Sequence, residues 1–274
     1  GTAYINGNTP TYKYFSLTQG ELTIARDAWF ANPQTKPHGD MTNWNVSAIT
    51  SMTTLFINKT TFGDGDGHPP EEDISGWDVG SVLSMHAIFR DTNFNQDISN
   101  WDTSQVTDMN FMFYGNTKFN NGDISGASNK SLRTNGDKWN TSSVEWMAYT
   151  FFNTQAFNQD ISNWDTGEVY DMQYMFQGSG LTTDRDLSGW NTSKVTNMTN
   201  MFKDTAMTTA WGSDNLRKGI QYWNVDKVTI FANFYGDTAT SAKKADFTLD
   251  VWGMNSFNLA ITELKNPSLG NGGV

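Results

Sequence analysis

An acidic, glycine-rich segment is the clearest candidate for ion binding in this chain. It carries Asp64, Asp66, Glu71 and Glu72 within a short stretch, with glycines between the first residues. Calcium is bound by several carboxylate and carbonyl oxygens on flexible loops of this kind. The third Asp and the later Glu of an EF-hand are missing. We therefore expect a solvated acidic loop, with a calcium site on these four residues as the alternative, and no cofactor that the protein requires.

Aromatic residues form the second candidate site. Each of Phe111, Tyr149 and Tyr174 follows a tryptophan by ten residues, and Trp146 and Tyr170 lie nearby in the sequence. Rings of this kind stack on sugars or anchor a partner protein. Lateral packing between neighbouring segments is the first interpretation. A ligand-binding surface of Phe111, Tyr149 and Tyr174, together with Trp211 in a separate insertion, is the alternative.

Catalytic chemistry has little support in the sequence. There are no cysteines, and the three histidines are His38, His68 and His86. Neither a nucleophile elbow, a His-Glu-x-x-His motif, a P-loop nor a dinucleotide fingerprint is present. We therefore predict that the protein is not an enzyme.

The charge balance limits the class of partner. Lys and Arg number 18 against 29 Asp and Glu, a net charge of −11, and no basic cluster interrupts this excess. Such a chain repels phosphate groups, so neither nucleic acid nor an anionic membrane surface is an expected partner. No apolar run reaches the length of a membrane span, so we expect no membrane insertion. The low charged fraction, 17%, fits an extracellular protein.

The chain is built from a repeated unit that begins at a tryptophan. The seven copies start at Trp44, Trp77, Trp101, Trp139, Trp164, Trp190 and Trp223. A unit of about 25 residues, recurring with insertions, is typical of a solenoid rather than a globular enzyme. We number each copy from its Trp as position 0. Position −3 is apolar in six copies, and positions 0, +5, +8 and +12 are almost always Trp, Val, Met and Phe. We expect these side chains to form the core.

The pattern within one copy predicts its local structure. Apolar residues at +5, +8, +11 and +12 follow the rhythm of one helical face, and Ser, Gly or Asp at +3 suits a helix N-cap. We expect a helix or 3₁₀ turn of about nine to eleven residues there, and a short strand before each Trp. Because −3 and 0 have opposite strand parity, the chain must bend before the Trp. The predicted fold class is an α/β repeat, a leucine-rich-repeat-like solenoid of about seven repeats.

Aspartate recurs at position −4 in five copies. These residues are Asp40, Asp73, Asp97, Asp160 and Asp186. Like charges at strand spacing repel one another, so each carboxylate is expected to accept hydrogen bonds from backbone N–H groups of the adjoining turn. The alternative is an exposed row of carboxylates that binds cations or basic partners.

One copy reads Phe94-Asn95-Gln96-Asp97-Ile98-Ser99-Asn100-Trp101-Asp102-Thr103-Ser104, continued by Val106, Met109, Met112 and Phe113. This signature resembles the BspA-type leucine-rich-repeat surface proteins, which carry the bacterial surface protein 26-residue repeat. The resemblance covers about residues 17 to 236. It implies an extracellular or cell-surface location and adhesion or protein binding, and it supplies no catalytic motif.

The predicted organisation has three parts. Residues 1–40 are an N-terminal extension with a capping helix, in which Thr18 and Glu21 form a capping box and Asn32-Pro33 ends the helix. Residues 41–236 are the seven-repeat solenoid, with insertions near 57–72, 126–138 and 206–219, which we expect on the binding side. Residues 237–274 are a strand-containing C-terminal cap.

Three functions fit these features. The first is a non-catalytic binding or adhesion module that recognises a protein or glycan through the solenoid surface and the insertion loops. The second is a self-assembling subunit of a surface layer, appendage or virion, in which the solenoid ends or the C-terminal strand pair with a neighbouring molecule. The third is a spacer that holds another domain away from the cell.

Overall fold

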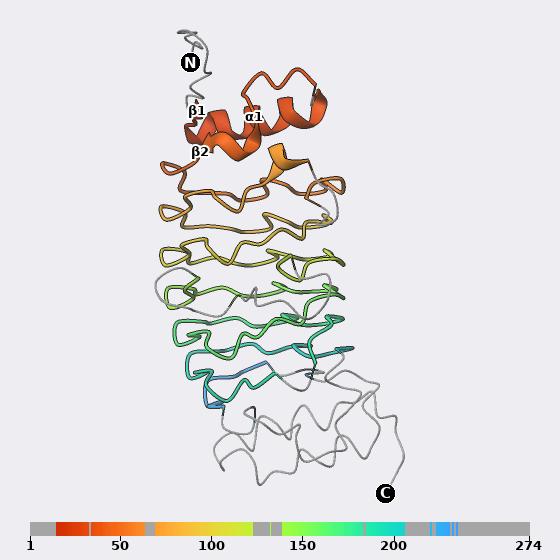
Figure 1. Cartoon of the computed structure of the whole chain (residues 1–274). Helices are drawn as coiled ribbons and strands as arrows, with labels where there is room; N and C mark the ends of the chain where they lie inside the picture. Colours follow the sequence, from red (N-terminus) through yellow and green to blue (C-terminus); the bar gives the residue numbers. More distant parts are fainter. Residues whose placement is uncertain are drawn as a thin grey trace, which may run out of the picture.

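The computed structural model describes residues 15–32, 34–63, 69–122, 139–182, 185–205 and 223–230, and the single residues 132, 220, 232 and 234. Regular secondary structure in these residues is sparse. It consists of the two-residue strands β1 (Phe15–Ser16) and β2 (Trp44–Asn45), the helix α1 (Gln19–Ala31), and the 3₁₀ turns η1 (Met41–Asn43) and η2 (Pro70–Glu72). The rest of the described chain runs in successive coils that lie one on another (Figure 1).

Helix α1 forms where the sequence predicts it. The hydroxyl of Thr18 accepts a hydrogen bond from the Glu21 N–H, and the Glu21 carboxylate accepts one from the Thr18 N–H, so the expected capping box is present. Its buried face packs on the first coil, where the Trp29 ring meets Trp44 edge-on at 6.5 Å. Strand β1 pairs in parallel with β2 on the same coil. Helix α1 therefore covers the N-terminal end of the stack (Figure 1).

Successive coils are held in one register. Position +7 of each copy forms a parallel β-bridge with position +7 of the next, a chain of contacts that runs from Ser51 through Ser84, Asp108, Trp146, Asp171 and Asn197 to Ile230. Each of these residues lies seven positions after its Trp, so the insertions do not shift the alignment. The sequence repeat is therefore also a repeat in space across the described residues.

A hydrogen-bond ladder joins the coils between positions +8 and +14. The N–H groups of +8, +10, +12 and +14 donate to carbonyls of +7, +9, +11 and +13 in the next coil, at 2.7–3.2 Å. Positions +10 and +14 adopt left-handed backbone conformations, with φ from +52° to +69°. With these left-handed residues in place, every second N–H points along the stack, and the side chains at +8, +11 and +12 are buried. We call this part of each coil the ladder side.

Two expectations for the local structure were wrong. The described residues between +3 and +13 contain turns rather than a helix, because the alternate N–H groups that a helix would use internally donate to the next coil. The described residues before each Trp contain no strand. There the Trp N–H donates to the carbonyl of −3, as Trp101 does to Ile98 at 3.0 Å. This turn supplies the predicted bend, and it lets −3 and 0 both point inward.

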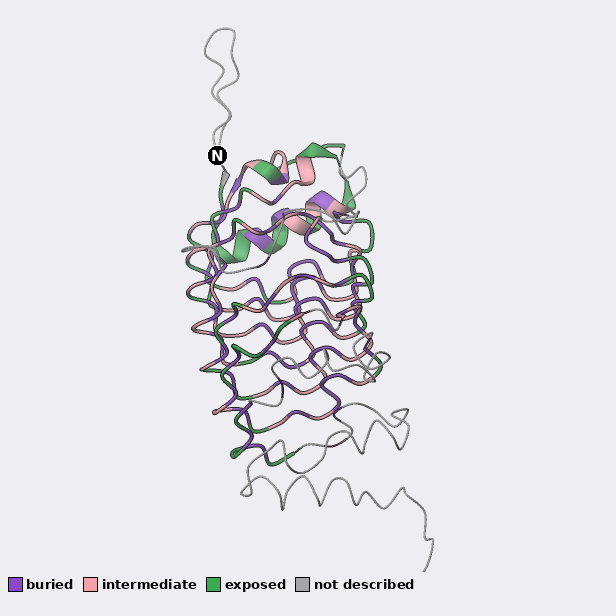
Figure 2. Cartoon of the chain, turned by 60° about the horizontal axis from the view of Figure 1, so that its bottom comes forward, coloured by how far each residue is buried: buried purple, intermediate pink, exposed green. Residues whose placement is uncertain are grey.

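The core consists of the expected residues. All seven repeat tryptophans are buried, and the phenylalanines at +12 stack along the molecule with centroids 5.5–5.8 Å apart from Phe56 to Phe202. Burial recurs at equivalent places in every coil (Figure 2). A buried indole needs an acceptor, and Trp101 donates from Nε1 to the carbonyl oxygen of Ile74 in the preceding coil at 3.1 Å. Trp77, Trp190 and Trp223 make the same bond to position −3 of the preceding coil, so these tryptophans fill the core and also join the coils.

The Asn and Asp residues outside the ladder side close tight turns. The carboxylates of Asp73, Asp97, Asp160 and Asp186 at position −4 each accept a hydrogen bond from the N–H two residues later, as predicted. The prediction was wrong for Asp40, which makes no such bond and instead pairs with Lys36 at 2.8 Å. At position +1, every copy has an Asn or Asp that accepts the same bond, for example Asp102 from the Ser104 N–H at 3.0 Å. These Asx turns explain the abundance of short polar side chains without assigning them to ligand binding.

Candidate functional site

Phe111, Tyr149 and Tyr174 lie in one stacked row on the ladder side. Phe111 and Tyr149 have ring centroids 4.6 Å apart with planes 8° apart, and Tyr149 and Tyr174 have centroids 4.5 Å apart with planes 7° apart. All three side chains are half-buried. The structure thus brings together three of the four predicted ligand-binding residues. The fourth, Trp211, and the whole insertion 206–219 lie outside the described residues.

A second aromatic row runs beside the first and was not predicted. Tyr114 and Phe152, both at position +13, stack with centroids 4.6 Å apart and planes 6° apart. Their planes are inclined by 46–57° to the rings of the first row. The sequence could have predicted them, because two neighbouring copies both have an aromatic residue at +13, just as three copies have one at +10. We call these five residues, Phe111, Tyr114, Tyr149, Phe152 and Tyr174, the aromatic patch.

A cation lies at one end of the aromatic patch. The guanidinium of Arg90 is 4.8 Å from the Tyr114 ring centroid and 5.7 Å from that of Phe111. It also pairs with the neighbouring Asp91 at 3.2 Å. Cation–π contacts of this kind stabilise a ring at an exposed site by about 0.5–1 kcal/mol. Arg90 therefore occupies the end of the rows next to the N-terminal coils.

Exposed apolar side chains extend this surface. Four described residues at +6 and +7 are among the most exposed large hydrophobics: Leu83 (49%), Trp146 (42%), Tyr170 (37%) and Ile230 (48%). Trp146 and Tyr170, singled out from the sequence, have centroids 6.1 Å apart. Beside them, Lys194 pairs with Glu168 and lies 5.9 Å from the Tyr170 ring centroid. This apolar border at +6 and +7 therefore lies next to the ladder side, which carries the aromatic patch.

The electrostatics of the aromatic patch favour a protonated phenol next to a carboxylate. Burial raises the pKa of Tyr149, and the neighbouring Tyr174, Tyr114 and Asp171 raise it further. Burial also raises the pKa of Asp171, although its carboxylate accepts hydrogen bonds from the N–H and the amide of Gln173 at 2.9 and 2.8 Å, which lower it. Tyr149 is thus a hydrogen-bond donor at neutral pH.

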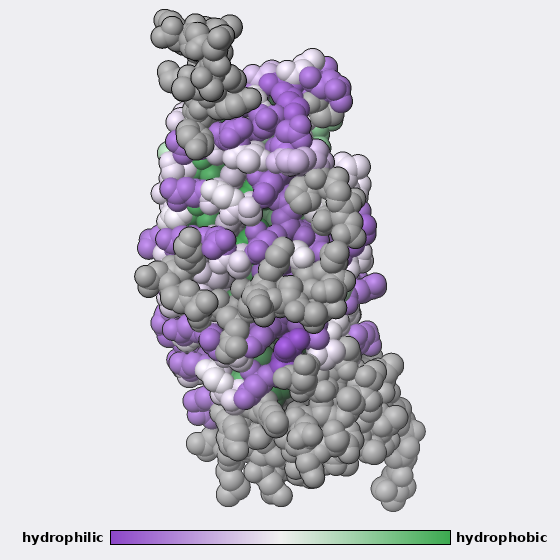
Figure 3. All heavy atoms as spheres, in the orientation of Figure 1, coloured by the Kyte–Doolittle hydropathy of each residue, from purple (hydrophilic) through white to green (hydrophobic). Residues whose placement is uncertain are grey.

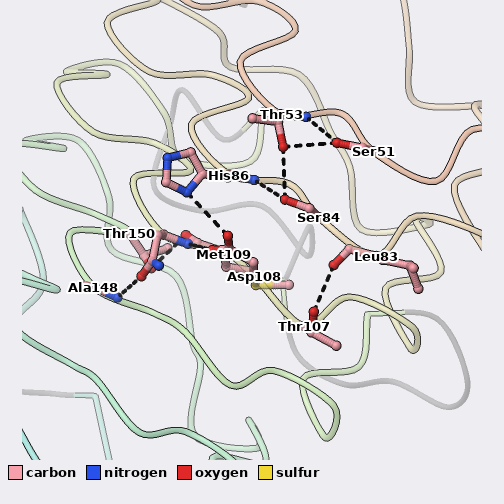
Figure 4. Close-up of polar contacts among 11 residues, drawn as sticks. Ser51, Thr53, Leu83, Ser84, His86, Thr107, Asp108, Met109, Ala148 and Thr150 are labelled. Carbon is pink, nitrogen blue, oxygen red and sulfur yellow. Dashed lines mark hydrogen bonds and ion pairs between the residues drawn. The ribbon is translucent and has the colours of Figure 1, made fainter. Parts of the chain in front are cut away.

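One histidine lies at the N-terminal margin of the aromatic patch. His86 Nδ1 is 3.3 Å from the Asp108 carboxylate, and its ring is 5.5 Å from Phe111. In Figure 4 the two side chains face each other across adjacent coils, beside the Ser84 and Thr53 hydroxyls, which are 3.0 Å apart. The pair orders the edge of the aromatic patch.

Two of the four predicted calcium ligands, Glu71 and Glu72, lie in the described residues, and Asp64 and Asp66 lie outside them. Glu71 pairs with Lys36 at 3.0 Å. A backbone hydrogen bond lowers the pKa of the Glu71 carboxyl, and the hydrogen bond from Lys36 lowers it further. Glu72 accepts a hydrogen bond from Trp29 Nε1 at 3.1 Å, which joins α1 to the first insertion, whereas Glu71 joins the segment after α1 to it. No cluster of three or more potential metal ligands is present in the described part of the chain.

The surface is mostly polar away from these features. Hydrophilic residues dominate the described part of the face in Figure 3, with apolar residues visible only in small areas between them. Within the described ranges, no helix is long and apolar enough to cross a membrane. Large apolar areas are unusual on a polar surface and often mark interaction sites. The aromatic patch with its border is therefore the best candidate for a functional surface.

The comparisons with known proteins place the chain in a family. A family model described as a Mycoplasma protein of unknown function, DUF285, matches residues 26–134 and 123–244, which together cover most of the chain. The chain therefore belongs to the DUF285 family. No curated protein and no solved structure matches it.

Proposed function

We propose that the protein is a non-catalytic binding module of the leucine-rich-repeat solenoid type, displayed outside the cell, which recognises a protein or glycan through its ladder side. The observation that carries this proposal is the half-exposed aromatic patch, because stacked rings at a surface are typical of recognition sites. The resemblance of the repeat to the BspA-type surface proteins supports the extracellular location. The register of the +7 bridges supports a solenoid.

The residues at position +10 make the ladder side a better candidate for the binding surface than the rest of the molecule. Position +10 is filled by Phe or Tyr in the three middle coils, whereas the terminal coils have Thr54, Ala87 and Asn200 there. All six residues share the left-handed backbone, so the fold itself does not require a ring at this position. A ring placed where the backbone accepts any of several residues supports a role in recognition.

Binding assays with matched variants test this proposal. The full chain is immobilised and exposed to panels of purified extracellular-matrix proteins and of defined glycans. Its variant Y149N/Y174N has Asn at +10, as the native Asn200 does, and the control Asn100→Ser alters an exposed residue outside the ladder side. We expect binding to at least one panel member that only Y149N/Y174N loses. Binding to no member, or binding that survives in Y149N/Y174N, would contradict the proposal.

A further inference from the structure

The orientation of the rings in the aromatic patch determines what they offer to a ligand. Tyr149 has Phe111 stacked on one face and Tyr174 on the other, both at about van der Waals spacing. Because these contacts cover both faces, the exposed part of the Tyr149 side chain is its ring edge and hydroxyl. Phe152 likewise has Tyr114 on one face. The centre of the aromatic patch therefore offers edges rather than faces to solvent.

An edge-on surface disfavours sugars. A pyranose stacks its C–H groups on the electron-rich face of an aromatic ring, and a ring edge carries the opposite partial charge. The outer face of Phe111 is not free either, because His86 and the Arg90 guanidinium lie 5.5 and 5.7 Å from it. Tyr149 and Phe111 thus have no open face for a glycan.

Ring edges suit groups that a polypeptide supplies. They attract backbone carbonyl oxygens and the faces of other aromatic rings, and they pack against aliphatic side chains. The Tyr149 and Tyr174 hydroxyls interact with each other and add hydrogen-bonding groups among the ring edges. Tyr residues that are held rigidly by their neighbours also lose little conformational entropy on binding, which makes them effective anchors for proteins.

The acidic residues at positions +6 and +7, beside the aromatic patch, indicate the charge that a partner carries. Positions +6 and +7 carry Asp108, Glu145 and Asp171 and no Lys or Arg in any of the seven copies. Asp171 lies close enough to Tyr149 to raise the pKa of its phenol. Its two hydrogen bonds from Gln173 leave acceptor capacity on the carboxylate. Together with the net charge of −11, this border favours a cationic partner.

We propose that the aromatic patch docks a protein segment that presents aliphatic or proline side chains to the ring edges and Lys or Arg side chains to the carboxylates at +6 and +7. This inference rests on the proposed function and specifies its ligand class. The apolar part of the segment lies over Tyr149 and Tyr174, and a cationic side chain reaches Asp171. A glycan ligand is the outcome that the ring geometry argues against.

Two defined probes test the inference on the full chain. A phage-displayed library of random short peptides is selected on the immobilised protein, and a glycan array is probed in parallel. The variants are Tyr149→Asn, which matches the residue at +10 in a native coil, Asp171→Asn, which matches Asn197 at +7, and the control Asn100→Ser. Circular dichroism and thermal unfolding verify that each variant is folded.

We expect selected peptides to combine Lys or Arg with aliphatic or proline residues. Tyr149→Asn should weaken their binding about tenfold, which corresponds to roughly 1.4 kcal/mol. Asp171→Asn should weaken it less, and only at low salt, because salt screens a partly exposed ion pair. Asn100→Ser should have no effect.

The alternative outcomes separate the inference from the proposed function. If glycans bind the wild-type chain and Tyr149→Asn abolishes this binding, the inference is overturned, but the protein is still a binding module. Selected peptides that are acidic, or that bind Asp171→Asn equally well at low salt, would overturn the predicted partner chemistry. The proposed function itself would be overturned if the chain bound none of the peptides, glycans or matrix proteins.

Discussion

Tyr149 and Tyr174 stack almost face to face, with centroids 4.5 Å apart, although 25 positions separate them in the sequence numbering. The contact joins two coils through residues at the same position of the repeat. The backbone makes it possible, because the Tyr149 N–H donates to the Gln173 carbonyl, which sets the spacing of the two coils. The stacking therefore follows from the ladder, and it gives the ladder side both stability and a surface.

This pair should show measurable energetic coupling. In a double-mutant cycle with Tyr149→Asn and Tyr174→Asn, we expect a coupling energy of about 0.5–1.5 kcal/mol, the usual value for an aromatic pair. Chemical denaturation of the four proteins measures it. The distant pair Tyr174 and Trp101 is the control and should be additive. A coupling energy near zero for Tyr149 and Tyr174 would mean that the rings do not stack in solution.

Trp101 should be the more costly tryptophan to remove. It is fully buried and donates a hydrogen bond to Ile74, so Trp101→Ala should lower the free energy of unfolding by roughly 3–5 kcal/mol. Trp146 is 42% exposed, and Trp146→Ala is the matched control, with an expected loss below about 1 kcal/mol. Thermal and denaturant unfolding compare the two variants. Equal losses would contradict the assignment of Trp101 to the core.

The inward-facing residues were predictable from the sequence, and the backbone conformation was not. Trp101 recurs at a fixed position with apolar neighbours, so its burial follows from the repeat. Helix α1 follows from Thr18 and Glu21, since a capping box is a local signal. The turns at +8 to +14 are different. Their apolar spacing imitates a helical face, but their conformation depends on N–H groups that pair with another coil, and no local pattern records such pairing.

The aromatic site was partly predictable for the same reason. Phe111, Tyr149 and Tyr174 share position +10, and a shared position in an in-register stack places side chains side by side. Tyr114 and Phe152 share +13, but their proximity to the first row depends on the left-handed residue at +10, which bends the chain between them. The edge-on presentation needs the ring planes, which only the structure gives.

Gly115 at position +14 should be required, because the preceding coil projects the Asp91 side chain over it. Gly115 has φ of +69°, and a Cβ there would lie 2.2 Å from the Asp91 carboxylate oxygen. Gly115→Ala should therefore lower the free energy of unfolding by about 1–3 kcal/mol, because the left-handed backbone is strained by a side chain and Asp91 must be displaced.

The control is Gly20→Ala in α1, where a Cβ meets nothing within 4 Å. It should raise stability by up to about 1 kcal/mol. Chemical denaturation measures both variants, and their midpoints should move in opposite directions. A Gly115→Ala midpoint at or above that of the wild type would be inconsistent with the close approach of the coils.

Asp171 should make stability depend on pH in a direction unusual for a carboxylate. Burial raises its pKa in the folded protein above the ordinary Asp value, so the folded state binds the proton more tightly than the unfolded chain. Its contribution therefore favours folding when the residue is protonated, and this contribution is lost as the pH rises through the raised pKa.

The variant Asp171→Asn tests this effect. It keeps an acceptor for the Gln173 N–H, as Asn197 does for Thr199 in the next coil. The variant should thus melt at a higher temperature than the wild type at neutral pH. The difference should vanish as the pH falls below the ordinary carboxyl range, where Asp171 is neutral in both states. Thermal melts across this range measure it, with Asp186→Asn as the comparison, since that carboxylate is exposed and serves only its own turn with Ser188. A lower melting temperature for Asp171→Asn at neutral pH would mean that the charge stabilises the fold, and that the half-buried carboxylate already has a cationic partner within the chain.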